Sequence, residues 1–295
     1  MSAAREESPL RRLARDFARS RVAVVGLAVL VLVMLAAVFA QVVAPQDPYD
    51  LAQLDIMDSL QPPGTAGGAG WTYWLGTDDQ GRDLWSAIVF GLRTSLEVGI
   101  LATLIALAIG VAVGLLAAYA GGAVDGAIMR LVDIQLSFPA ILIALILLAL
   151  LGKGVDKVIV ALAAVQWAYY ARTVRGSALV ERRKEYVEAA RCLALPHHRI
   201  MLRHLLPNCL PPLIVVATVQ VAHAIALEAT LSFLGVGVPV TEPSLGMLIA
   251  SGYGFMLSGN YWVSLFPGVA LLVVIVAINL VGDRLRDVLN PRLSH

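Results

Sequence analysis

The chain has 295 residues, of which 59% are hydrophobic and 15% charged, and its mean hydropathy is +0.79. Soluble globular domains are about 45–50% apolar and about 25% charged, so a soluble multi-domain enzyme is excluded. The formal net charge of +1 excludes a chain that binds nucleic acid through a global basic field. The two cysteines, Cys192 and Cys209, exclude a disulfide framework. The apolar residues gather in long blocks, which predicts an all-α polytopic membrane protein.

Six blocks meet or approach the roughly 20 apolar residues that a membrane-spanning helix needs. The predicted spans are Val22–Ala40, Val98–Ala118, Leu131–Leu151, Val155–Ala171, Leu213–Leu234 and Val263–Val281. The third and fourth blocks contain charged residues and can cross only if those groups face protein or a water-filled cavity. The first block resembles a secretory signal, but it is longer than the roughly 7–15 residues of a signal core. We interpret it as an uncleaved first helix.

The distribution of lysine and arginine predicts the orientation. With the N-terminus inside, 18 of the 22 basic residues fall in inner segments, and the outer segments hold only Arg82, Arg93, Lys153 and Lys157. Because cytoplasmic loops of membrane proteins carry the excess of positive charge, six spans with both termini in the cytoplasm are predicted.

The chain divides into segments of different character. We predict a cytoplasmic amphipathic segment at 1–21, a first transmembrane helix at 22–43, an extracytoplasmic loop at 44–94, a five-helix core at 95–283 with a cytoplasmic hairpin at 177–208, and a cytoplasmic tail at 284–295. The first segment suits either a helix lying on the inner leaflet or an ordinary positive-inside anchor. Within the hairpin, Leu195-Pro196 predicts a break between two helices.

The second span contains a pair of glycines at helical spacing. Gly110 and Gly114 form a small face that allows close contact with another helix. The sequence leaves two partners open for this face, a helix of this chain or a second membrane subunit.

The chain lacks motifs for nucleotide binding and covalent catalysis. It has no Gly-x-x-x-x-Gly-Lys-Ser/Thr loop, no Gly-x-Ser-x-Gly elbow and no His-Glu-x-x-His helix. The histidines at 197, 198 and 204 have no further ligands at a spacing that suits a metal. We therefore expect no cofactor or metal on this chain and no enzymatic activity of its own.

Several motifs spread over nearly the whole chain resemble those of one family. The run Glu188-Ala189-Ala190, followed by Leu206-Pro207-Asn208, is similar to the EAA loop of ABC importer permeases. Further segments resemble the smaller-loop permease of the dipeptide/oligopeptide/nickel group, namely Trp74–Asp83, Gly91–Leu96, Leu231–Gly235, Asn279–Asp283 and Asn290–Arg292. The chain is thus similar to an inner-membrane permease of that family.

The resemblance implies a fold, a function and partners. The fold would be that of a type I ABC importer permease, with six transmembrane helices and a coupling hairpin. The partners would be a second homologous permease, two ATPase subunits that hold ATP and magnesium, and an extracytoplasmic substrate-binding protein, in a bacterial cytoplasmic membrane. The cargo would be peptides, with nickel or glutathione as the alternative.

The resemblance also implies which residues contact the ATPase. These are Glu188, Ala189, Ala190, Ala194 and Pro207. Ala189 and Ala190 would supply a small contact face and Glu188 a charge for a donor on the partner. Ala194 occupies the position of the family's glycine. If the turn requires a positive φ there, alanine is strained, because glycine reaches that region freely and alanine does not.

Four polar residues within the predicted spans are candidates for the translocation pathway. They are Asp133, Gln220, His223 and Glu228. A carboxylate at membrane depth is costly unless it is paired or wet, so Glu228 is expected to face either protein, as a helix-to-helix hydrogen bond, or the pathway. An ion-coupled secondary transporter acting through Asp133 and Glu228 is the less favoured reading, because the two halves of the chain show no convincing repeat.

Overall fold

The computed structural model describes residues 9–50, 54–67, 70–239 and 241–289. Its helices are α1 Pro9–Ala18, α2 Arg21–Val38, α3 Ala40–Val43, α4 Leu84–Ala120, α5 Gly122–Ser137, α6 Ala140–Leu151, α7 Val155–Glu181, α8 Glu185–Cys192, α9 His197–Arg199, α10 Leu206–Phe233, α11 Leu245–Tyr253 and α12 Trp262–Leu289. A π-helical turn, η3 Ile200–Leu205, joins α9 to α10, and single 3-10 turns lie at η2 Ile56–Asp58 and η4 Met256–Ser258. Strands β1 Thr65–Ala66 and β2 Thr72–Tyr73 pair antiparallel. The predicted all-α membrane fold is confirmed.

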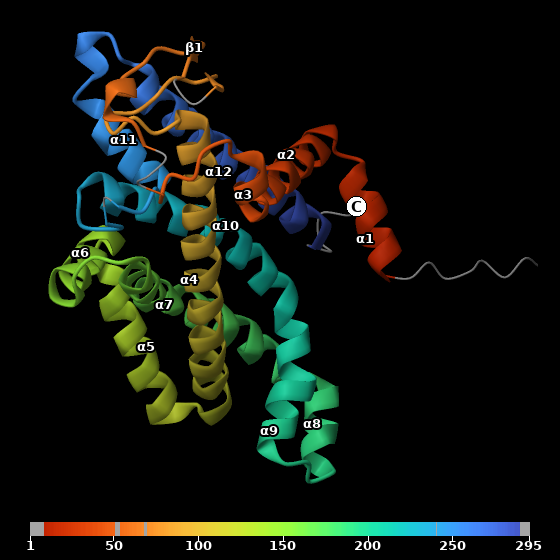
Figure 1. Ribbon diagram of the computed structural model, residues 1–295. Coiled ribbons are helices and arrows are strands. Elements are labelled where there is room, and N and C mark those ends of the chain that lie inside the picture. The colour runs from red at the N-terminus through yellow and green to blue at the C-terminus, as the bar shows by residue number, and fades with distance from the viewer. Residues whose placement is uncertain (1–8, 51–53, 68–69, 240, 290–295) are drawn as a thin grey trace, which may run out of the picture.

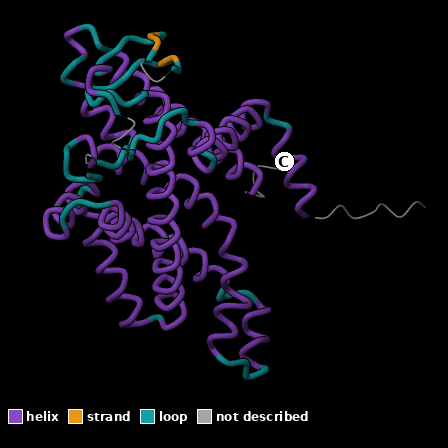
Figure 2. Tube along the Cα trace, in the orientation of Figure 1, coloured by secondary structure: helices purple, strands orange, loops and turns teal. Residues whose placement is uncertain are grey.

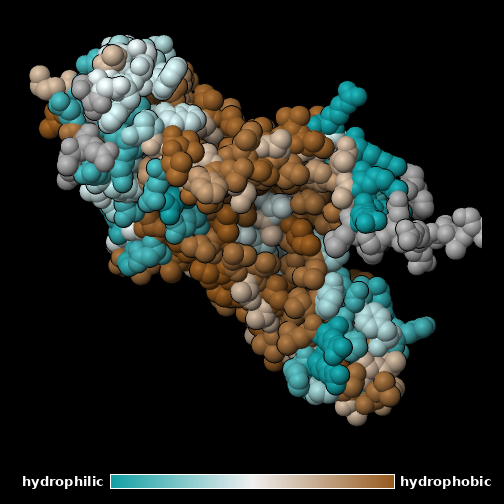
Figure 3. Space-filling model, turned by 45° about the vertical axis from the view of Figure 1, so that its right-hand side comes forward, coloured by the Kyte–Doolittle hydropathy of each residue, from teal (hydrophilic) through white to brown (hydrophobic). Residues whose placement is uncertain are grey.

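Four helical segments of the described chain are long and apolar enough to cross a membrane. They are Arg21–Val38, Leu84–Ala120, His197–Phe233 and Trp262–Leu289. A fifth span results if α5 and α6 count as one, although the two helices meet at an angle of 92°. The predicted count of six spans is not confirmed, because α7, which contains the predicted span Val155–Ala171, is not among the segments that pass on length and apolarity. Figure 3 shows an apolar surface over the middle of the molecule between hydrophilic ends.

The third predicted span, Leu131–Leu151, is wrong as a continuous helix. Its first half lies in α5 and its second half in α6, and Phe138 between them has extended backbone (ψ 144°). The residue before a proline is pushed away from the helical region, so Pro139 ends α5 and starts α6 in a new direction (Figure 1).

Helix α4 is the longest helix of the described chain. It begins at Leu84, well before the predicted span Val98–Ala118, and its 37 residues extend about 55 Å at 1.5 Å per residue. The hydrocarbon layer of a membrane is about 30 Å thick, so part of α4 stands outside it. Figure 1 shows the β1–β2 pair near one end of α4 and the α8–α9 hairpin beyond the other. Residues of α4 belong to the core clusters that involve α7, α10 and α12.

The glycine pair of α4 packs against α7 of the same chain. A Cβ placed on Gly110 would lie 2.4 Å from the Tyr170 Cβ, and one on Gly114 would lie 2.5 Å from the Ala171 carbonyl oxygen. Neither distance is possible for real atoms, so only glycine permits this approach. Of the two partners that the sequence leaves open, the structure therefore assigns a helix of this chain.

The segment before α4 folds into a lobe, defined here as the described residues from 44 to 83, in which loops and the strand pair predominate (Figure 2). The Arg82 Nε lies 2.6 Å from the Asp78 Oδ2, and both side chains are at most 4% exposed. The Trp262 Nε1 donates to the Thr77 carbonyl oxygen at 3.2 Å, which fastens the lobe to α12. The Asp83 carboxylate caps α4 by accepting from the Ser86 backbone N–H at 2.8 Å. The last part of the predicted loop 44–94 is therefore the start of α4.

The buried ion pair generates a first prediction. Asp78→Asn removes the carboxylate charge that is paired with the buried Arg82 guanidinium, and breaking such a buried pair typically costs about 3–5 kcal/mol. We expect the variant to be degraded at the lobe by added protease under conditions in which the parent protein resists. Asp156→Asn is the control, because the Asp156–Lys157 pair is exposed and such pairs contribute little to stability. Equal protease resistance of the two variants would contradict the assignment.

Candidate functional site

The hairpin predicted at 177–208 comprises residues 182–205 in the structure, and the name is used for that range from here on. It connects the end of α7 to the start of α10. Helix α7 ends at Glu181, α8 follows from Glu185, and Pro196 caps the start of α9 with φ −65° and ψ 145°. The predicted break at Leu195-Pro196 is confirmed. Tyr186 links the two sides: its hydroxyl donates to the Glu181 Oε2 at 2.7 Å and accepts from the Asn208 Nδ2 at 3.1 Å. Burial and the Glu181 carboxylate raise the pKa of Tyr186 to about 12, so it stays protonated at neutral pH.

The hairpin is rooted in the same core as α4 and α7. Val187 of α8 and Leu205 of η3 are 0% exposed, and both belong to the cluster that includes Leu115 of α4 and Val174 of α7. Because protein interiors are close-packed and transmit strain, this shared core connects the hairpin mechanically to α7 and α10.

The two alanines of the predicted contact face differ in exposure. Ala189 is exposed together with Glu188, whereas Ala190 is only 4% exposed and packs in the core of the hairpin. Ala190 is therefore not on the exposed side of α8, and its role in docking stays a prediction. Successive helical residues are rotated by about 100°, which turns Ala190 toward the core while Glu188 and Ala189 stay at the surface. Ala194 and Pro207 are exposed.

The turn does require a positive φ at Ala194, so the backbone strain that the sequence predicts for that case is present. Ala194 has a φ of +52°. Its N–H donates to the Arg191 carbonyl at 2.9 Å, and the Leu195 N–H donates to the Ala190 carbonyl at 3.2 Å. This pair of hydrogen bonds is a Schellman motif, which ends a helix with a left-handed residue that is usually glycine. The alanine thus keeps the turn geometry at the cost of backbone strain.

Sequence reasoning missed an arginine cluster beside α8, because it counted these residues only for the orientation. Arg182, Arg183 and Arg191, with Glu188 and Leu179, line a cavity of ≈ 400 Å³. The Arg182 Nη1 donates to the Ala118 carbonyl oxygen at 2.6 Å, and the Arg191 guanidinium lies 5.7 Å from the centre of the Tyr119 ring. The lining of this cavity therefore carries three guanidinium groups and one carboxylate, that of Glu188.

The structure does not bring the four intramembrane polar residues together. Asp133 is exposed on α5 and forms an ion pair with Arg172 of α7. His223 is exposed on α10, whereas Gln220 and Glu228 are buried. Asp133 and Glu228 therefore have different surroundings, the first exposed and paired with Arg172 and the second buried.

Glu228 connects two helices through hydrogen bonds. It is 0% exposed, its Oε2 accepts from the Ser95 Oγ of α4 at 2.7 Å, and its Oε1 accepts from the Ser232 Oγ at 2.8 Å. The Ser232 Oγ in turn accepts from the Val238 N–H at 3.2 Å. Of the two surroundings that the sequence leaves open, the side chain faces protein.

The turn at Ala194 generates a matched pair of substitutions. A left-handed alanine costs roughly 1–2 kcal/mol, and Ala194→Gly relieves this strain. Part of the resulting gain in stability is lost, because glycine gives the unfolded chain more freedom. We expect slower hydrogen exchange of the α8 amides. Ala189→Gly, the same change within a helix, costs about 1 kcal/mol and should speed exchange. Faster exchange in both variants would contradict strain at Ala194.

The chain matches two described families. Residues 110–295 match "Binding-protein-dependent transport system inner membrane component", and residues 8–63 match "N-terminal TM domain of oligopeptide transport permease C". A putative peptide transport system permease protein of Brucella suis is 41% identical over 98% of this chain and 94% of its own length. The di/tripeptide transport system permease protein of Pseudomonas aeruginosa is 38% identical over the same shares.

Two further comparisons concern a different cargo and the fold. The glutathione transport system permease protein of Pectobacterium atrosepticum is 36% identical over 97% of this chain and 92% of its own length. A solved structure of the MetNI methionine ABC transporter in an inward-facing conformation has a TM-score of 0.57 and 24% identity, and the match covers 70% of this chain and 98% of that chain. This chain belongs to the family of binding-protein-dependent transport system inner membrane components, the permeases of ABC importers.

Proposed function

We propose that the chain is a peptide-translocating subunit of an ATP-driven importer. It acts in a bacterial cytoplasmic membrane with a second permease, two ATPase subunits that bind ATP and magnesium, and an extracytoplasmic binding protein. The observation that carries the proposal is the hairpin: its tip is exposed, while its root lies in the core shared by α4 and α7. The relatives named as peptide and di/tripeptide permeases support the cargo.

The proposed mechanism is mechanical. ATP-driven closure of the ATPases moves α8, and the close-packed core transmits the displacement to α7 and α10. Ala189 provides a contact without bulk, and Glu188 provides an acceptor for a donor on the ATPase. Arg182, Arg183 and Arg191 favour acidic residues on the partner's docking surface.

Docking through the exposed side of α8 is tested with two tryptophan variants. Ala189→Trp adds bulk at the contact, so we expect the ATPase subunits to be lost on co-purification and ATP-dependent uptake to fall to background. Ala14→Trp is the control, because Ala14 is also an exposed helical alanine and lies on α1. Normal co-purification and uptake with Ala189→Trp would refute docking at this position.

The proposed orientation places the hairpin in the cytoplasm and the lobe outside. Cys192 is exposed on the hairpin, so it should not react with a membrane-impermeant thiol reagent added to sealed cells. Thr241→Cys, at an exposed position of the connection before α11, should react. Permeabilised cells provide the control, since Cys192 must then become reactive. Labelling of Cys192 in sealed cells would reverse the orientation.

Glu228 is proposed to fix the packing of α4 against α10 rather than to line the pathway. Glu228→Gln keeps the shape and most hydrogen bonding, so assembly, basal ATP hydrolysis and transport should persist. Glu228→Leu leaves buried hydroxyl groups unpaired, which costs about 1–3 kcal/mol for each group, so the melting temperature of the complex should fall. A Gln variant that assembles and hydrolyses ATP but does not transport would instead assign the charge to the pathway.

The cargo is tested by uptake into proteoliposomes that contain the complete transporter and its binding protein. We expect ATP-dependent accumulation of labelled di- and tripeptides. Glutathione is the second candidate, because a glutathione permease is among the relatives. Accumulation of glutathione alone, with no peptide uptake, would replace the proposed cargo.

A further inference from the structure

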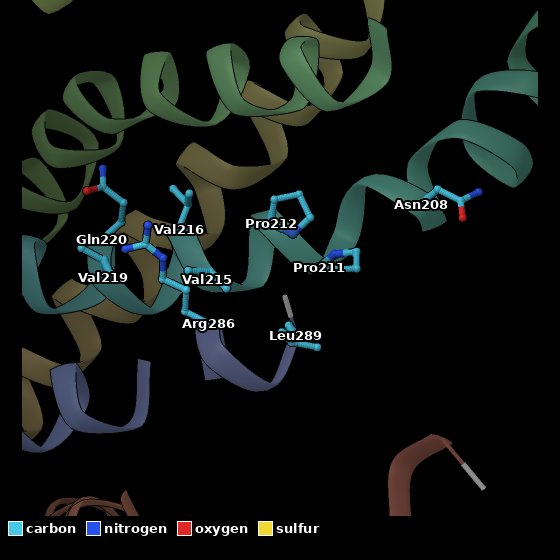
Figure 4. Close-up of a pocket in the computed structure, with 9 residues that line it drawn as sticks. All are labelled: Asn208, Pro211, Pro212, Val215, Val216, Val219, Gln220, Arg286 and Leu289. Carbon is cyan, nitrogen blue, oxygen red and sulfur yellow. The ribbon is translucent and has the colours of Figure 1, made fainter. Parts of the chain in front are cut away.

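A cavity of ≈ 760 Å³ lies between α10 and the last turns of α12. Its size falls within the roughly 300–1,000 Å³ of small-molecule sites. Figure 4 shows Gln220 and Arg286 at one end of the lining, Asn208 at the other, and prolines and valines of α10 between them. The lining is therefore polar at both ends and apolar in the middle.

The Arg286 end offers hydrogen-bond donors. The Arg286 side chain is exposed, lines the cavity, and carries a positive charge with several donors. Gln220 also lines this end, but its Nε2 is closed off from solvent and does not face the open cavity. A carboxylate matches the guanidinium, because guanidinium–carboxylate hydrogen bonds are among the strongest in proteins.

The opposite end offers acceptors. The Asn208 Nδ2 donates to the His204 carbonyl oxygen and the Tyr186 hydroxyl, so the amide oxygen is the atom that Asn208 presents to a ligand. Pro212 has no N–H and cannot donate to the Asn208 carbonyl, its usual helical acceptor. Two oxygen acceptors at this end suit an ammonium group.

The distance between the ends selects the length of the ligand. Gln220 follows Asn208 by twelve residues in α10, which is about 18 Å at 1.5 Å per residue. An extended chain advances about 3.3–3.6 Å per residue, so about five residues span the cavity. A shorter peptide reaches the donor end and the apolar stripe of Pro212, Val215 and Val219.

We propose that this cavity is a binding site for short peptides, which holds the free α-carboxylate at Arg286 and seats apolar side chains on the valine stripe. The proposal rests on the proposed peptide transport and adds a defined stopping point for the cargo on this subunit. In the proposed orientation, the site lies at the cytoplasmic half of α10, where a peptide stays before release.

The test measures protection of an engineered cysteine in the complete transporter, reconstituted in nanodiscs so that both faces are accessible. Val219→Cys is made with Cys192→Ser, because Cys192 is the exposed cysteine. Val276→Cys is the matched control: the two valines are 45% and 44% exposed, and Val276 lies on α12 away from the cavity. The probes are trialanine and trialanine amide, which differ only in the terminal carboxylate.

We expect trialanine to slow thiol labelling of Val219→Cys about fivefold at about four times its dissociation constant, since 1 + [L]/Kd is then about five. Trialanine amide should give no more than a small effect, and Val276→Cys should label at the same rate with and without peptide. Arg286→Gln should abolish the protection, whereas Arg286→Lys should retain part of it.

Four results would overturn the site. They are equal protection by the amide, protection that survives Arg286→Gln, absence of protection, and absence of labelling at Val219→Cys, which would indicate that a partner subunit fills the cavity. Uptake of the same trialanine by the parent transporter is measured in parallel. Loss of uptake in the parent rejects peptide transport itself, whereas uptake without protection rejects only this binding site.

Discussion

The backbone contact between α4 and α7 at Gly110 and Gly114 is the constraint on which the other parts depend. It forms the centre of the largest helix–helix contact in the described chain. Because the backbones touch, neither helix can slide or rotate without a steric clash. Helix α4 carries the lobe near one end, and α7 leads directly into the hairpin. This contact thereby connects the lobe rigidly to the hairpin without a disulfide.

The sequence predicts the fold where a residue acts through its own backbone, and fails where the outcome depends on neighbours. The proline at 196 breaks the hairpin where the sequence predicts it, because a proline restricts the residue before it whatever surrounds it. The proline at 139 acts in the same way, although the apolar run around it predicts one continuous span. The apolar pattern does not show that α4 starts at Leu84. Lobe residues cover the first turns of the helix, and a polar cap, Asp83, marks its start instead of an apolar run.

The same distinction, between features set by one residue and features set by its neighbours, applies to the candidate functional site. The strain at Ala194 follows from a single position once the turn is known to require a positive φ, because φ is a property of one residue. The burial of Ala190 does not, because the direction of a side chain on a short helix is set by what packs beneath it. The surroundings of Glu228 likewise require the partner helix: Ser95 lies 133 residues earlier in the chain, and no local pattern pairs the two.

The attachment of the lobe has a consequence for biogenesis. Thr77 accepts from the Trp262 indole 185 residues further along the chain, and Asp16 accepts from Arg284 across 268 residues. At a synthesis rate of about 5–20 residues per second, the first of these intervals corresponds to about 10–40 s. During that time the lobe exists without its anchor, so its surface is open to proteases and chaperones until the last helix is inserted. The lobe thus reaches its final attachment only after nearly the entire polypeptide has been made.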